Sequence, residues 1–243
     1  MMATIHSIMQ GKGGVGKSVI AALSAQYLIA LGRKPLCIDT DPVNATFHGY
    51  KALNVHRLEI LEGNEINPRR FDDLVDLVAG SHEDIIIDNG ASTFVPLAHY
   101  LITNDIPAMF KDMHRKLVIH TVITGGQALR DTVSGFSQMA AQFPGDAVFM
   151  VWLNPFWGPI EHEGKGFEEM KACKQHRSQI EAILEIPAFR SDMAGRDLSD
   201  MLRARRTFDE SLQDAALPIM VRQRLKIARD RLFQLCDTAG ALS

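Results

Sequence analysis

A glycine-rich segment near the N-terminus has residue types and spacing suited to phosphate chemistry. It contains Gly11, four further residues, and then Gly16, Lys17 and Ser18, which is the phosphate-loop pattern. Glycines let backbone N–H groups turn inward around a polyphosphate; the lysine reaches the terminal phosphates and the serine hydroxyl holds Mg²⁺. We therefore expect phosphate to be bound by Gly11, Lys12, Gly13, Gly14, Val15, Gly16, Lys17, Ser18 and Val19.

The sequence on either side separates this segment from an ordinary glycine-rich turn. Ile5 to Met9 is typical of a short apolar strand, and Val19 to Leu31 is typical of an apolar helix. A strand–loop–helix unit is the context that the pattern requires, and the new helix adds its positive N-terminal end. Lys12 is a second lysine in the loop, and the pattern itself does not require it.

Three acidic residues follow apolar strands. Asp39 is the last residue of the expected strand 34–39, and Asp41 follows that strand. Asp88 is the last residue of the expected strand 84–88. Mg²⁺ keeps several waters and few protein ligands, so we assign Asp88, and secondarily Asp39, to magnesium together with Ser18. Asp41 lies one step further out, where it would position the attacking water. The alternative for each acid is a helix N-cap or a turn residue.

Short apolar runs alternate with helical patterns along the chain, which favours a parallel sheet. Besides the elements above, we expect helices at 68–79, 127–143 and 167–184, strands at 117–123 and 147–153, and a helical segment at about 196–243. Ligands bind beyond the carboxyl ends of the strands in such sheets. The prediction is a single α/β domain over residues 1–243, with a doubly wound, mainly parallel sheet and helices on both faces.

The composition is that of an ordinary globular protein. The chain has 243 residues, 46% hydrophobic, and a net charge of −3, so it can bury one sizeable core and is no nucleic-acid polycation. Its three cysteines, Cys37, Cys173 and Cys236, are far apart, which favours a reducing compartment. No secretory signal and no apolar run of about 20 residues is present, so we expect a cytoplasmic protein.

The sequence resembles the ParA/MinD group of P-loop ATPases, which has a deviant Walker A motif. The resemblance rests on the phosphate loop with Lys12, on the segment Asp39-Thr40-Asp41-Pro42 and on Asp88. The resemblance implies a P-loop NTPase fold, ATP/ADP and Mg²⁺ as cofactors, slow hydrolysis and a homodimer that encloses ATP. It implies that Lys12 reaches the phosphates bound by the partner copy, whereas Lys17 and the catalytic acid Asp41 act on the nucleotide bound by the same copy. It also implies that Asp88 belongs to the second switch.

The same resemblance implies a residue that binds adenine. The family has an asparagine after a later strand, and Asn154 matches it in position. A side-chain amide offers the donor and the acceptor that an adenine edge requires. Asparagine before proline is also an ordinary turn former.

Segments over most of the chain resemble a narrower group, the accessory ATPases of conjugative plasmid transfer. They are 39–47, 87–92, 124–129, 152–155 and 158–165. This resemblance implies a role in conjugative DNA transfer or partition, with conjugation, relaxosome or partition proteins as partners. Asn89-Gly90-Ala91 replaces the proline pair of the partition ATPases, and Gly90 permits a positive φ, so their partner surfaces are not transferred.

Two other functions remain as alternatives. One is a nucleotide-binding adaptor that does not hydrolyse ATP. The other is a metabolic ATP-dependent enzyme of the dethiobiotin-synthetase type, whose relatives lack the lysine found here at position 12.

The C-terminal segment is basic and amphipathic. Its apolar stripe is Val221, Leu225, Ala228, Leu232 and Leu235, and five basic residues lie between them. We expect a closing helix that packs through this stripe and leaves its arginines in water. The arginines, with Arg203, Arg205 and Arg206, leave non-specific DNA binding open, whereas we do not expect membrane contact.

Overall fold

Seven parallel strands form the centre of the computed structural model, which describes residues 3–143, 145–189, 193–238 and 240. They are β1 (Thr4–Ile8), β2 (Leu36–Asp39), β3 (His56–Arg57), β6 (Ile85–Asp88), β7 (Lys116–Thr124), β8 (Ala147–Asn154) and β11 (Ile180–Glu185). The order across the sheet is β11-β8-β7-β1-β6-β2-β3. The chain builds the β6-β2-β3 side first and the β7-β8-β11 side afterwards, so the order reverses at β1, where ligands bind in such sheets.

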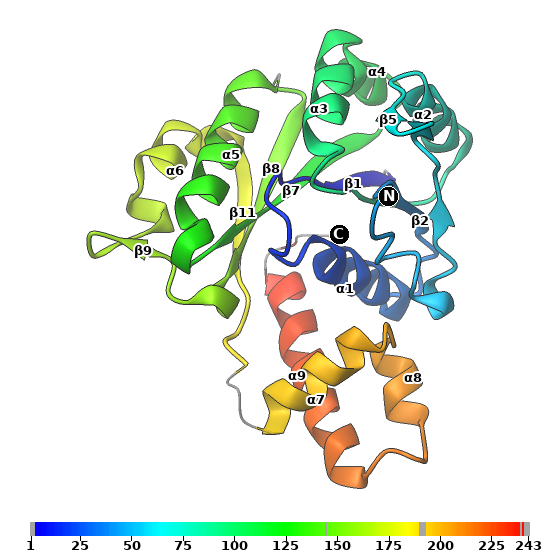
Figure 1. Cartoon of the computed structure of the whole chain (residues 1–243), viewed down its shortest axis with the longest axis vertical. Coiled ribbons are helices and arrows are strands. Elements are labelled where there is room, and N and C mark those ends of the chain that lie inside the picture. The colour runs from blue at the N-terminus through cyan, green and yellow to red at the C-terminus, as the bar shows by residue number, and fades with distance from the viewer. Residues whose placement is uncertain (1–2, 144, 190–192, 239, 241–243) are drawn as a thin grey trace.

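Helices cover both faces of this sheet (Figure 1). They are α1 (Lys17–Ala30), α2 (Arg70–Gly80), α3 (Phe94–Thr103), α4 (Ile106–Asp112), α5 (Leu129–Gln142), α6 (Lys171–Gln175), α7 (Met193–Arg203), α8 (Phe208–Gln213) and α9 (Ile219–Thr238). The apolar core of one face takes residues from α2 to α6, and that of the other takes residues from α1, α7, α8 and α9. The predicted doubly wound α/β architecture is confirmed.

Helix α1 is apolar on nearly every side because it is enclosed between the sheet and the C-terminal helices. Its buried residues include Ile20, Leu23 and Leu28. Two polar side chains connect it to those helices: the Tyr27 hydroxyl donates to Asp237 Oδ1 at 2.5 Å, and Gln26 Oε1 accepts the Phe208 backbone N–H at 2.7 Å. The helix that begins at the phosphate loop is therefore also the support of the C-terminal helices.

The sequence predicted most of these elements to within a few residues, but the helix expected at 167–184 is wrong. Only α6 is helical there apart from short 3-10 turns, and the stretch ends in β11, the edge strand that pairs in parallel with β8. The polar character of much of this stretch favoured a helix. The structure places Ile180 in the core of one face and Leu184 in the core of the other, because a register shift between Ile180 and Ala182 interrupts the regular alternation of side chains.

The structure also contains elements that the sequence did not predict. They are the helices α3 and α4, the antiparallel pair β4 (Leu61–Glu62) and β5 (Glu65–Ile66), and the antiparallel pair β9 (Glu161–His162) and β10 (Lys165–Gly166). Each short hairpin is two residues per strand and projects from the sheet domain. Among the described residues, no helix is both long and apolar enough to cross a bilayer.

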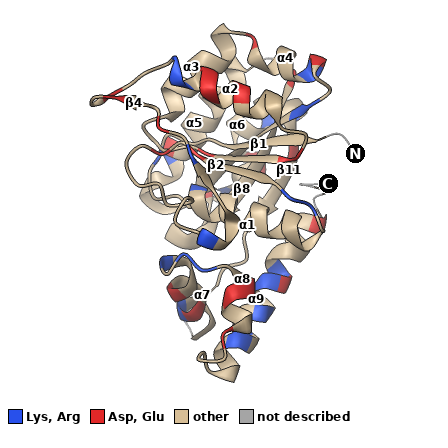
Figure 2. Ribbon diagram, turned by 90° about the vertical axis from the view of Figure 1, so that its right-hand side faces the viewer, with Lys and Arg blue, Asp and Glu red and all other residues tan. Residues whose placement is uncertain are grey.

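The C-terminal segment forms three helices rather than one continuous helical run. Figure 2 shows that α7 and α9 carry charges of both signs, whereas the charged residues of α8 are both acidic. The expected apolar stripe of α9 packs on the core as predicted: Leu225, Ala228 and Leu232 are buried, and Val221 and Leu235 are partly buried against them. Residues 239 and 241–243 of the predicted segment lie outside the described residues.

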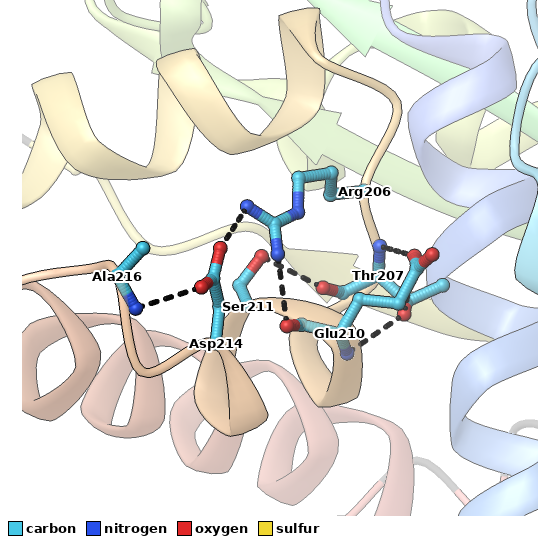
Figure 3. Close-up of polar contacts among 6 residues, drawn as sticks. All are labelled: Arg206, Thr207, Glu210, Ser211, Asp214 and Ala216. Carbon is cyan, nitrogen blue, oxygen red and sulfur yellow. Dashed lines mark hydrogen bonds and ion pairs between the residues drawn. The ribbon is translucent and has the colours of Figure 1, made fainter.

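Ion pairs and a capping box order the turns that join these helices (Figure 3). Arg206 Nη1 pairs with Asp214 Oδ2 at 2.7 Å and Arg206 Nη2 donates to the Glu210 carbonyl at 3.0 Å. Thr207 caps α8 by accepting the Glu210 N–H, while the Glu210 carboxylate accepts the Thr207 N–H. Reciprocal capping of this kind stabilises a short helix by satisfying two orphan donors.

A chain of buried rings crosses three strands of the sheet. Trp152 Nε1 donates to His120 Nδ1 at 2.9 Å, and His120 Nε2 lies 2.9 Å from His6 Nδ1. Because an indole nitrogen only donates, His120 carries its proton on Nε2 and donates it to His6. Burial lowers the pKa of His120 to about 3 and, with the nearby His120, holds that of His6 well below its ordinary value. Both rings are therefore neutral.

All three cysteines are free and buried, each in a different layer of the fold. Cys37 lies in β2, Cys173 in α6 and Cys236 in α9. Burial raises the pKa of Cys37 and of Cys236 to about 12. These thiols are unreactive packing residues in the native state.

Candidate functional site

The phosphate loop connects the end of β1 to the start of α1. Gly14 and Gly16 have φ angles of 74° and 104°, which only glycine adopts without strain. A Cβ on Gly16 would also lie 3.1 Å from the amide nitrogen of Asn154. Gly11, Lys12, Gly13 and Gly14 are exposed, whereas Val15 is buried and anchors the loop. The loop thus presents its backbone to solvent at the N-terminus of α1.

Lys17 lies within the curve of this loop. Its side chain is 8% exposed, and its ammonium group donates to the Lys12 carbonyl at 3.0 Å. Burial lowers the pKa of Lys17, and the nearby carboxylates of Asp88 and Asp41 act in the opposite direction. A cation fixed here, next to free loop N–H groups, is placed to bind phosphate.

Lys12 points away from its own loop. Its ammonium group pairs with Asp131 Oδ2 at 2.7 Å, with side chains 45% and 57% exposed. Asp131 lies in the first turn of α5. Sequence reasoning missed this residue, and its place in a first helical turn was the only available signal. Two lysines of one loop therefore have opposite orientations.

Asp88 is a buried carboxylate at the carboxyl end of β6. Within the described part of the chain, neither of its oxygens has a well-formed hydrogen bond. The pKa of Asp88 is raised to about 7, chiefly by burial and also by the carboxylates of Asp39 and Asp41, while the Ser18 hydroxyl and Lys17 oppose the rise. Buried polar groups without partners are costly, and two free oxygens beside the Ser18 hydroxyl fit the small ligand set that Mg²⁺ uses.

Asp39 is buried too, but its oxygens are already engaged. Oδ1 accepts the Asp41 N–H at 2.9 Å and Oδ2 accepts the His48 N–H at 2.8 Å. Burial raises the pKa of Asp39 and these N–H groups lower it. The residue fixes the loop after β2, and it is less available to a metal ion than Asp88. Among the described residues, no group of three or more His, Cys, Asp or Glu side chains could hold a metal by itself.

Asp41 caps the turn that follows it. Its Oδ1 accepts the N–H groups of Val43 at 2.9 Å and Asn44 at 3.1 Å, as the turn alternative predicted. A Cβ on Gly90 would lie 2.8 Å from Asp41 Cγ. Gly90 does not use the positive φ that a glycine permits; the glycine is required instead by its closeness to Asp41. The loops after β2 and β6 are in direct contact.

Asn154 is bonded to the phosphate loop. Its Nδ2 donates to the Val15 carbonyl at 2.9 Å and its Oδ1 accepts the Phe156 N–H at 3.2 Å. An amide has two donors and two acceptor sites, so one of each remains for a ligand.

Asn89 is a buried residue of the site to which the sequence analysis gave no role of its own. Its amide accepts the Thr40 hydroxyl at 2.8 Å and donates to the Ser7 hydroxyl at 3.0 Å and the Ile8 carbonyl at 3.1 Å. It therefore ties together the ends of β1, β2 and β6. Its position directly after Asp88 was the only sequence signal.

These features have a counterpart in known proteins. The model of the CobQ/CobB/MinD/ParA nucleotide binding domain matches residues 6–228, which includes the loop, the three acids and Asn154. The chain belongs to this family. The predicted ParA/MinD membership is thereby confirmed, and the CobQ/CobB/MinD/ParA assignment makes the chain a nucleotide-binding protein.

Within this family, the chain is similar to two proteins of Escherichia coli that are both named Protein TraL. One is 61% and the other 62% identical over 241 residues, which is 99% of this chain and 100% of each relative.

Solved structures of the family share the fold. The MinD cell division protein of Aquifex aeolicus has a TM-score of 0.53 at 19% identity, covering 96% of this chain and 97% of its own. A chain of the MinC:MinD cell division protein complex of the same organism has a TM-score of 0.55 at 15% identity, with 96% of both chains covered. The predicted P-loop NTPase fold is confirmed.

Proposed function

We propose that this protein is a nucleotide-switched ATPase that binds Mg-ATP, dimerises with it and hydrolyses it slowly, as an accessory component of conjugative plasmid DNA transfer. Family membership supports nucleotide binding, and the likeness to Protein TraL over the whole chain supports the transfer role. Conjugation, relaxosome or partition proteins are the partners that we expect to stimulate hydrolysis.

The orientation of Lys12 is the observation that supports the proposed dimer. Lys17 already occupies the interior of the loop, and Lys12 extends outward to Asp131 instead. An exposed pair of this kind contributes only about 0–1 kcal/mol, so it is easily exchanged for a phosphate contact. A second copy facing the loop would offer that phosphate.

The other residues divide the remaining work. Lys17 and the loop N–H groups bind the phosphates. Ser18 and Asp88 would hold Mg²⁺ with support from Asp39, and a bound ion would supply neutralisation of the charge that develops during phosphoryl transfer. Asp41 positions the water; its contact with Gly90 couples it to the second switch.

Sizing the protein with and without Mg-ATP tests this proposal. We expect the wild type to shift from monomer to dimer with ATP, and Lys12→Ala to bind ATP but stay monomeric. No change in size of the ATP-saturated wild type would contradict the dimer mechanism.

Turnover separates the two alternatives. A measurable ATPase rate that Asp41→Ala abolishes excludes a non-hydrolysing adaptor. Formation of ADP with free phosphate, without any acceptor substrate, excludes an enzyme of the dethiobiotin-synthetase type.

A further inference from the structure

Two exposed aromatic side chains lie at the rim of the phosphate loop. Phe156 is 74% exposed and Trp157 is 58% exposed, and both belong to the 3-10 turn Pro155–Trp157 that follows β8. Their rings meet edge to face with centroids 5.0 Å apart. Two neighbouring exposed aromatic rings beside a ligand site indicate a contact surface.

Trp157 is attached to the phosphate loop itself. Its indole Nε1 donates to the Gly14 carbonyl at 3.4 Å, and Asn154, three residues earlier, donates to the next carbonyl, that of Val15, at 2.9 Å. Two side chains of one turn therefore bind two successive carbonyls of the loop. The indole is held beside the loop that binds phosphate and beside the amide expected to bind adenine.

The backbone of the turn is held equally firmly. A Cβ on Gly126 would lie 2.6 Å from the Trp157 carbonyl oxygen, so the loop after β7 packs against the turn with no space to spare. The Thr124 hydroxyl donates to the Asn154 carbonyl at 2.8 Å. The turn and the Trp157 indole are consequently held in place without a ligand, and a preorganised surface binds more tightly.

We propose that Trp157 is the stacking platform for the nucleobase of the bound nucleotide. A nucleotide with its phosphates in the loop places its base close to the loop's rim, and stacking on an aromatic ring suits any base because every base has a π face. Trp157 thus supplies affinity, while the spare donor and acceptor of Asn154 select the base. This inference rests on the proposed function, since it requires a nucleotide in the loop.

Calorimetric titration of two Trp157 variants tests the platform. The titrations use Mg-ATP and Mg-tripolyphosphate in a Lys12→Ala background, where dimerisation does not contribute. We expect Trp157→Ala to weaken ATP binding by about tenfold or more and to leave tripolyphosphate binding unchanged. Trp157→Phe keeps a ring but loses the bond to Gly14, and we expect it to retain most of the ATP affinity.

Intrinsic fluorescence gives a second readout, because the chain has two tryptophans and Trp152 is fully buried. Quenching by acrylamide therefore reports mainly on Trp157. We expect ATP to protect it from the quencher and tripolyphosphate to leave it accessible.

Three outcomes have distinct meanings. Equal weakening of ATP and tripolyphosphate binding by Trp157→Ala would overturn the inference, because Trp157 would then only support the loop. Trp157→Ala with Lys12 intact could also keep its ATP affinity but lose the ATP-dependent dimer. That result would overturn the inference as well, because the Trp157 ring would then contact a second copy of the chain. Failure of the unsubstituted protein to bind ATP would instead contradict the proposed function.

Discussion

At the scale of the residue, Asp88 is a buried carboxyl in an environment that disfavours its charge. It is 1% exposed, lies beside two other carboxylates, and has a pKa of about 7. A carboxyl that is raised from about 4 in the unfolded chain destabilises the folded protein progressively as the pH rises from about 4 to about 7. The ligand-free protein therefore carries a strain that a cation would relieve.

We expect Asp88→Asn to stabilise the ligand-free protein at pH 8 by about 1–3 kcal/mol and to abolish Mg-dependent ATP binding. The substitution keeps the size of the side chain and removes the buried charge. Urea unfolding at pH 8 and pH 5 measures it, and the gain should shrink at pH 5, where Asp88 is already protonated. A variant that is less stable than the wild type at pH 8 would contradict this account.

At the scale of the element, the loops after β2 and β6 meet at Asp41 and Gly90. We expect Gly90→Ala to reduce ATP hydrolysis by at least about tenfold, because the new Cβ would displace Asp41. ATP affinity should change little, since the phosphate loop is untouched. Single-turnover hydrolysis and equilibrium binding separate the two effects.

Gly80→Ala is the matched control, because a Cβ at Gly80 has no neighbour within 4 Å among the described residues. We expect it to hydrolyse ATP as the wild type does. Normal hydrolysis by Gly90→Ala would show that the contact between the two loops is irrelevant to the reaction.

The buried ring chain across β1, β7 and β8 produces a pH dependence of opposite sign. The pKa of His120 is about 3 in the folded protein and about 6.5 in the unfolded chain. The unfolded state therefore binds more protons in this range, and stability falls as the pH drops from about 6.5 to about 3. We expect this fall to be clear in unfolding curves of Asp88→Asn, where the Asp88 contribution is absent, and a flat profile would contradict it.

The sequence predicted the elements whose patterns are local. The phosphate loop is specified by its own spacing, and Asp39 and Asp88 by the strands that precede them. Asp131 and Trp157 could not be found in this way, because their importance comes from contacts with Lys12 and Gly14 more than 100 positions away. The strand β11 was missed for the same reason, since its pairing with β8 decides its conformation.

At the scale of the whole molecule, α7, α8 and α9 are joined to the sheet domain through α1. We expect Leu225→Ala in α9 to destabilise the protein by about 2–4 kcal/mol, because Leu225 is 1% exposed. Ile227→Ala, two positions along the same helix and 44% exposed, should change stability by less than about 0.5 kcal/mol. Thermal unfolding of both variants measures the difference, and equal effects would mean that α9 is not packed as described.

The three buried cysteines are natural probes of which layer of the fold unfolds locally first. Cys37 is in the sheet, Cys173 is on one face and Cys236 is on the other, so each thiol meets a labelling reagent only when its own layer opens. The order of modification, followed by mass spectrometry, would rank the local stabilities of the layers without any engineered probe. If a nucleotide slowed the labelling of Cys236, binding at the phosphate loop would stabilise the C-terminal helix α9 against local unfolding.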